Sequence, residues 1–191
     1  MKKLTTICAF LSIVTVSFGQ TTGSNQLIRA ETITPGNSLF IQYDYGTCYI
    51  SHERQIIIEA TQSDSFMVTM KKRLPVGYRL YKYKSVKKKY ETQDSIQIKE
   101  PFTFKFPKMG ERDYCTVTRE YLLETSFTVS RLSLARFLNE FIYLADNKKL
   151  ELSYTGIAGL YCYIQLKQNK LTQEYSFDGW YHLETEIQRQ K

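Results

Sequence analysis

Apolar and polar residues alternate along most of the chain from Ser38 onward. Within 39–45, Leu39, Ile41 and Tyr43 share one side of an extended chain, while Gln42 falls on the other. Because successive side chains of a β-strand point to opposite faces, this period of two predicts strands. In chain order the predicted strands cover 39–45, 55–60, 66–70, 79–84, 87–92, 96–98, 102–106, 115–123, 150–154, 160–166, 171–177 and 180–187.

One segment, 130–147, has a different period. Leu134, Leu138 and Phe141 recur there at the spacing of a helix face. A serine hydroxyl at position 130 or 133 can accept a free backbone N–H at the start of this helix. The sequence therefore predicts one amphipathic helix packed on a sheet.

The fold class that follows is α+β, with a predominantly antiparallel sheet and the helix 130–147 on it. Aromatic residues make up 14% of the chain, with 15 Tyr and 11 Phe, which suits β structure. We expect a loose N-terminal lead over 20–37, closed by a turn at Pro35-Gly36, followed by a single domain over 38–191.

Residues 1–19 have the features of a cleavable signal peptide. Lys2 and Lys3 precede an uncharged apolar run over 4–18, and Ser17 and Gly19 supply the small residues that a signal peptidase needs. The run is shorter than the roughly 20 residues of a membrane-spanning helix, although an uncleaved anchor is the alternative interpretation. We predict export to the periplasm or the extracellular space, with a mature chain that starts at Gln20 and has no transmembrane span.

Charge is unevenly distributed in the mature chain. Removal of Lys2 and Lys3 lowers the formal net charge from +7 to +5. The segment 71–90 holds nine basic residues and no acidic one, so the rest of the mature chain is mildly acidic. A global attraction to nucleic acid is therefore not indicated.

The basic segment also contains tyrosines, and this combination is the strongest candidate for a binding site. Cationic side chains neutralise phosphate or sulfate groups, and aromatic rings stack on bases or sugars. The alternative is a solvated edge hairpin whose lysines prevent aggregation. The candidate binding residues are Lys71, Lys72, Arg73, Arg79, Tyr81, Lys82, Tyr83, Lys84, Lys87, Lys88 and Lys89.

Two smaller groups of residues are weaker candidates for catalysis or metal binding. Cys48, His52 and Glu53 lie within six residues and could supply a nucleophile with its base, or metal ligands. Their spacing matches no established motif, and a turn between strands is the simpler explanation. No internal repeat or nucleophile elbow is present, and no cofactor is predicted.

The second group lies near the C-terminus. If 180–187 is a regular strand, His182, Glu184 and Glu186 share one face and could hold a cation or act as an acid–base pair. Polar side chains on the solvated face of an antiparallel strand are the simpler explanation.

These observations favour an exported, non-enzymatic binding domain. Its expected partner is a protein, a glycan or an anionic surface at the cell envelope, and not nucleic acid. The alternative is a small secreted hydrolase or metal-dependent enzyme. Cleavage of the signal also removes Cys8, so Cys48, Cys115 and Cys162 remain, and any one pair of them could form a disulfide.

Overall fold

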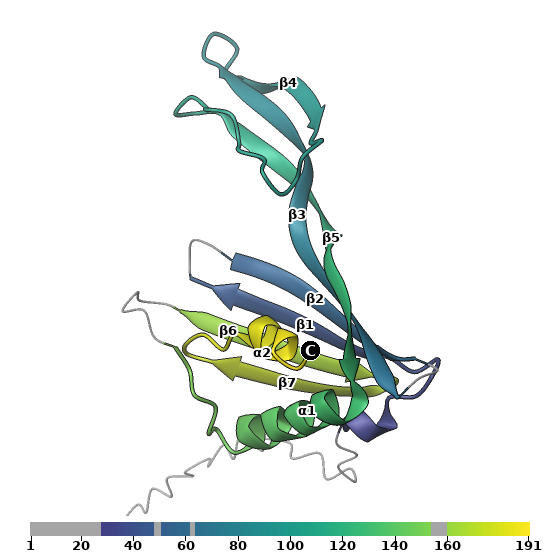
Figure 1. Ribbon diagram of the computed structural model, residues 1–191. Helices are drawn as coiled ribbons and strands as arrows, with labels where there is room; N and C mark the ends of the chain where they lie inside the picture. Colours follow the sequence, from purple (N-terminus) through teal and green to yellow (C-terminus); the bar gives the residue numbers. More distant parts are fainter. Residues whose placement is uncertain (1–27, 48–50, 62–63, 154–159) are drawn as a thin grey trace, which may run out of the picture.

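A computed structural model describes residues 28–47, 51–61, 64–153 and 160–191 of the chain (Figure 1). It confirms an α+β fold built on one antiparallel sheet. The elements are η1 (Ala30–Thr32), β1 (Leu39–Gly46), β2 (Ser51–Ala60), β3 (Ser65–Lys84), β4 (Lys89–Gln97), β5 (Tyr114–Ser130), α1 (Arg131–Asp146), β6 (Tyr161–Gln168), β7 (Leu171–Phe177) and α2 (Leu183–Gln188).

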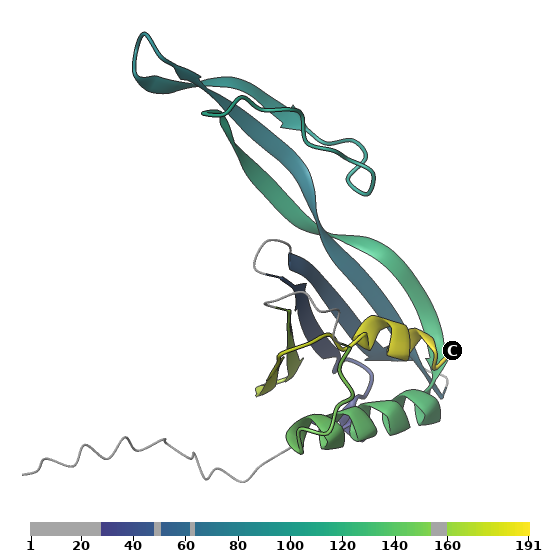
Figure 2. The ribbon, with the colours of Figure 1, turned by 90° about the vertical axis from the view of Figure 1, so that its left-hand side faces the viewer.

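The molecule has two parts, which we call the arm (residues 75–119) and the body (all other described residues). In the body the strand order is β7-β6-β1-β2-β3-β5, with antiparallel pairing throughout. In the arm, β4 takes the place of β2 beside β3, while β5 continues along the other edge. Figures 1 and 2 show the arm projecting well away from the body.

One face of the body sheet carries the hydrophobic core. The apolar alternation of β1, β2, β3 and β6 turns its buried residues toward this face, and both helices cover it (Figure 2). Helix α1 contributes Leu134, Leu138, Phe141, Ile142 and Ala145, and α2 contributes Leu183 and Ile187. The predicted helix is thus confirmed, with Ser130 and Asn147 at its ends, but the Ser130 side chain makes no capping hydrogen bond.

The arm joins the body through a short stretch in which β3 has only β5 beside it. Pairing of β2 with β3 ends at Lys72, and pairing of β4 begins at Gly77. The register against β5 shifts between Pro75 and Gly77, so the bulge falls in this stretch. Proline has no backbone N–H to donate to a regular ladder. A bulge interrupts that ladder, so proline is tolerated beside it.

Five predictions about individual segments are wrong. The segments 66–70 and 79–84, predicted as two strands, belong to the single twenty-residue strand β3. The segments 87–92 and 96–98, also predicted as two strands, fall largely within the single strand β4. The segment 102–106 is a loop, and 180–187 contains α2 in place of a strand. At 150–154 the described residues hold only an isolated bridge between Ser153 and Trp180.

The N-terminal lead is packed where the structure describes it. Ile28, Ala30 and Ile33 are buried in the core around η1, and Gly36 takes a positive φ of 82° at the predicted turn. Of the described residues, no helix is both long enough and apolar enough to cross a membrane.

Candidate functional site

The predicted basic stretch 71–90 is divided between the body and the arm. Lys71, Lys72 and Arg73 lie on the part of β3 that crosses the body, while the remaining candidates follow β3 to the tip of the arm. The candidate residues therefore do not form one continuous patch.

At the base of the arm, Arg73 belongs to a polar network on the outer face of the body sheet. Its Nη1 lies 2.5 Å from Oε2 of Glu53, and the Tyr121 hydroxyl donates to the same carboxylate at 3.3 Å. The hydrogen bond to Glu53 raises the pKa of Arg73. Gln42 links the network to β1, with Nε2 donating to the Tyr121 hydroxyl at 2.8 Å. Arg73 and Glu53 thus join β3 to β2 in the body, just before the arm begins.

In the distal part of the arm, strand alternation separates aromatic from basic side chains. Tyr81 and Tyr83 point to one face of β3, and Lys82 and Lys84 point to the other. Lys89 pairs in register with Lys84 and shares its face. Lys87 and Lys88 lie in the exposed turn at the tip, where Lys88 has a φ of 47°.

The face that carries Lys82 and Lys84 is partly covered by the loop between β4 and β5. Phe104 and Phe106 pack on Tyr78, with ring centroids 5.5 and 6.0 Å away. The opposite face, which we call the tyrosine face, carries Tyr81, Tyr83, Tyr90 and Tyr114.

Net positive charge is concentrated in the arm as a whole. Residues 75–119 contain eleven basic and five acidic side chains, a net charge of +6, whereas the other described residues have a net charge of −1. Because the Debye length is about 8 Å at physiological ionic strength, charges on both faces of so thin a sheet act together on a ligand at the tip.

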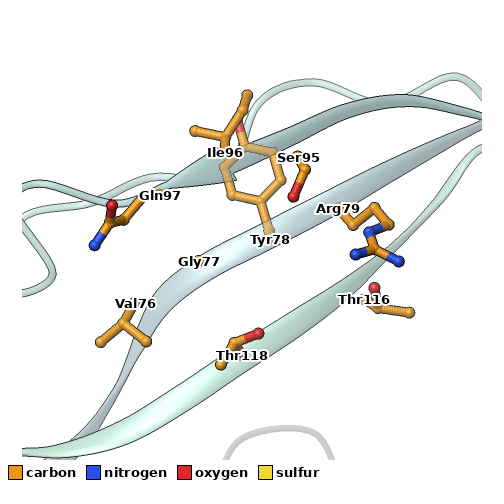
Figure 3. A pocket seen from close by; sticks show the side chains of 9 residues that line it. All are labelled: Val76, Gly77, Tyr78, Arg79, Ser95, Ile96, Gln97, Thr116 and Thr118. Atoms are coloured by element: carbon orange, nitrogen blue, oxygen red, sulfur yellow. The ribbon is translucent and has the colours of Figure 1, made fainter.

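A hollow of about 510 Å³ lies on the arm beside the tyrosine face (Figure 3). Gly77 forms its floor, because it has no side chain between the flanking strands. The walls carry polar groups from three strands: Arg79 of β3, Ser95 and Gln97 of β4, and Thr116 and Thr118 of β5. Of these residues, sequence analysis identified only Arg79.

In the body, the structure separates the members of the first catalytic candidate. His52 and Glu53 are neighbours on β2 and point to opposite faces of the sheet, His52 toward Tyr45 and Glu53 toward Arg73. Cys48 lies outside the described residues. His52 and Glu53 therefore cannot act together on one group.

The second candidate is also rearranged, because 183–188 is a helix. Leu183 and Ile187, four residues apart, face the core and place Glu184 at its edge, whereas Glu186 pairs with Arg189 on the surface. His182 precedes the helix and is exposed. The prediction that His182, Glu184 and Glu186 share a strand face is therefore wrong.

One residue of each candidate group nevertheless lies in the same aromatic row. His52 stacks on Tyr45 at 5.1 Å, Tyr45 meets Trp180 at 6.0 Å, and Trp180 meets His182 at 5.9 Å. The two imidazoles lie at opposite ends of this row. Burial, assisted by the positive charges of Lys72 and Arg54, lowers the pKa of His52.

Arg54 links this end of the core to two carboxylates. Its Nη1 lies 2.7 Å from Glu124 Oε2, and its Nε lies 4.0 Å from Glu184 Oε1. Glu124 on β5 lies at a register shift: Met70 of β3 pairs with Thr125 and Lys71 pairs with Leu123, so Glu124 falls between the two pairs. The three side chains join β2, β5 and α2, which assigns them a structural role. Among the described residues, no three potential metal ligands come together.

The two described cysteines lie in different parts of the molecule. Cys162 is buried in the body core, and Cys115 lies in the arm opposite Leu80; neither forms a disulfide. Burial raises the pKa of the Cys162 thiol to about 12, which makes it a poor nucleophile.

The chain was compared with protein-family models, curated proteins and solved structures, and nothing matched in any of the three.

Proposed function

We propose that this protein is an exported binding protein whose arm holds an anionic polymer. The observation that carries the proposal is the concentration of a net charge of +6 on a thin projecting element, beside a body whose charges nearly cancel. A polyanion gains binding free energy when cationic side chains release its condensed counterions. A projecting arm can reach such a polymer while the body is held elsewhere.

Several arm lysines are available for this role. Among the described residues, Lys82, Lys84 and Lys88 form no ion pair with an acidic side chain, whereas Lys87 and Lys89 lie 3.0 and 3.6 Å from Glu91. Exposed pairs of this kind contribute about 0–1 kcal/mol, so a polyanion can displace Glu91 from both lysines.

Retention of the mature protein on immobilised heparin tests the proposal. We expect the wild type to bind at low salt and to elute as salt rises. The triple substitution Lys87→Glu, Lys88→Glu and Lys89→Glu should remove retention. A matched control places the same charge change in the body, at Lys149, Lys167 and Lys170, which are exposed; this variant should elute close to the wild type.

Two results would overturn the proposal. The first is failure of the wild type to bind heparin at low salt. The second is equal loss of retention in the arm and body variants, because binding would then depend on total charge and not on the arm.

The export part of the proposal has its own test. When the full chain is expressed in a bacterial host with a periplasm, the mass of the recovered protein should correspond to a chain that starts at Gln20. Recovery of the intact 191-residue chain from the cytoplasm would contradict export.

A further inference from the structure

The tyrosine face of the arm is a preformed surface. Tyr81 on β3 pairs with Tyr114 on β5, and their rings stack at 4.5 Å with an angle of 8° between the planes. Tyr90 on β4 meets Tyr114 edge to face at 4.8 Å and tilts against Tyr83 at 5.2 Å. Such mutual packing holds the rings in place, so a ligand would not need to order them.

This packing limits which ligands the surface suits. Tyr81 and Tyr114 cover each other's faces, and the guanidinium carbon of Arg112 lies 5.4 Å from the centre of the Tyr83 ring. Nucleobases bind single-strand proteins by stacking on free aromatic faces, and this packing leaves fewer such faces open. The phenol hydroxyls remain, and none of the four hydrogen-bonds to another described residue. The surface therefore favours a ligand rich in hydrogen-bonding groups.

The hollow over Gly77 presents the same kind of chemistry (Figure 3). The side chains of Arg79, Ser95, Gln97, Thr116 and Thr118 form no hydrogen bond or ion pair with other described residues. They offer hydroxyls, an amide and a guanidinium around a space whose volume falls in the usual range of about 300–1,000 Å³ for small-ligand sites. In Figure 3 the Arg79 guanidinium lies over Thr116, at one end of the hollow.

The hollow and the tyrosines form one track. Gly77 and Tyr83 are six residues apart on β3, which corresponds to about 20 Å along a strand. Hydroxyl, amide and guanidinium groups therefore follow one another from the hollow toward the tip, on an element with net positive charge.

We infer that this track binds an acidic oligosaccharide. One sugar sits over Gly77, with its carboxylate or sulfate on Arg79 and its hydroxyls on Thr116, Thr118 and Gln97, and the following sugars lie against the tyrosine hydroxyls. Sugars both donate and accept hydrogen bonds, as do the hydroxyl and amide groups on this track. A guanidinium suits a carboxylate or sulfate because it donates two parallel hydrogen bonds. The inference rests on the proposed function and names its ligand class.

The test uses the whole mature protein and a heparin-derived hexasaccharide, with affinity measured by titration calorimetry. We expect Arg79→Gln to weaken binding at least tenfold. The double substitution Thr116→Val and Thr118→Val keeps the charge and shape of the strand and removes two hydroxyls, and it should weaken binding about fivefold. The matched controls are Arg136→Gln on α1 and Thr128→Val on the body part of β5, and both should stay within twofold of the wild type.

An NMR titration of the wild type locates the binding site without relying on variants that could fold poorly. On addition of the hexasaccharide, backbone amide NMR signals should shift at 77–81, 95–97 and 114–118, whereas those of β6 and β7 should not. Shifts confined to the turn 85–89 would overturn the inference.

Other outcomes separate this inference from the proposed function. If heparin retention depends on the tip lysines but hexasaccharide affinity is unchanged by Arg79→Gln and by the double valine variant, only the inference fails. The inference also fails if an oligothymidylate of equal charge, or phosphatidylglycerol vesicles, bind the wild type as tightly as the hexasaccharide does and the double valine substitution leaves the affinity for all of these ligands unchanged. If no polyanion binds at low salt, both fail.

Discussion

In the body, β3 and β5 turn Phe66, Val68 and Val129 into a core that both helices cover, whereas in the arm the same two strands bury little besides Tyr78. The arm instead leaves Tyr90, Phe102, Phe106 and Tyr114 exposed by two-fifths or more. Burial of apolar surface is the main force that stabilises a fold. The body should therefore fold cooperatively, while the arm depends on its two-stranded attachment and can open locally. The arm's exposed surface is therefore less well packed than the body.

Cysteine labelling should show the largest difference between the two parts. Burial raises the pKa of Cys162 to about 12, so at pH 8 only roughly one thiol in 10⁴ is ionised, and the core shields it as well. Cys115, in the arm, becomes accessible through local opening. With N-ethylmaleimide at pH 8, followed by peptide mass spectrometry, we expect Cys115 to react on the order of 10³-fold faster than Cys162. Equal rates would show that the arm is held as firmly as the body.

Truncation of one phenylalanine in each part compares their packing directly. Phe141 on α1 is 1% exposed and contacts Tyr175 and Tyr181, so Phe141→Ala should lower the free energy of unfolding by about 3–5 kcal/mol. Phe104 packs on Tyr78 but is only partly buried, and Phe104→Ala should cost about 1 kcal/mol or less. Urea unfolding followed by circular dichroism measures both. A loss of 3 kcal/mol or more in Phe104→Ala would place the arm in the cooperative core.

The sequence predicted the body better than the arm. In the body, strands and helices each bury one side, and this burial produces both the alternation and the helical spacing of apolar residues. The predicted bounds of β1, β7 and α1 therefore agree with the structure to within one residue. In the arm, residues 102–106 alternate as cleanly as any strand, yet Pro101 and Pro107 flank them and they form a covering loop. Alternation reports which side of a segment is apolar, and it does not report whether a neighbouring strand is available.

The candidate sites show the same limit. The basic stretch was correctly identified as unusual, but its division at Pro75–Gly77 depends on where β2 ends and β4 begins, which is a long-range property. Thr116 and Thr118 gave no signal, because they gain meaning only when β5 lies beside Gly77. Helix α2 was missed because Leu183 and Ile187 form only a single helical turn of apolar spacing, which 180–187 also matches as a strand.

Removal of one charged partner should also affect the two parts differently. Arg54 is 13% exposed and lies between Glu124 and Glu184, so Arg54→Met leaves two carboxylates at the edge of the core without their partner. Because breaking a buried pair costs about 3–5 kcal/mol and this one is partly solvated, we expect a loss of about 2 kcal/mol in urea unfolding. The control Lys87→Met breaks the exposed pair with Glu91 and should change stability by less than about 0.5 kcal/mol. Equal effects would mean that Arg54 does not fasten α2 to the sheet.

The smallest expected effect is a pH dependence that belongs to the body alone, since both histidines lie there. The pKa of His52 is lowered, mainly by burial and then by the charges of Lys72 and Arg54, so the folded state favours the neutral imidazole. The unfolded chain then binds more protons below its ordinary pKa of about 6.5. The contribution of His52 to stability is therefore complete above that pH, and it declines as pH falls from 6.5 through the lowered folded pKa. Urea unfolding at pH 7.5, 6.5 and 5.5 should show a steeper decline for the wild type than for His52→Gln. Parallel curves would contradict the burial of His52 against Tyr45, and a shallower wild-type curve would reverse the sign of its coupling to the fold.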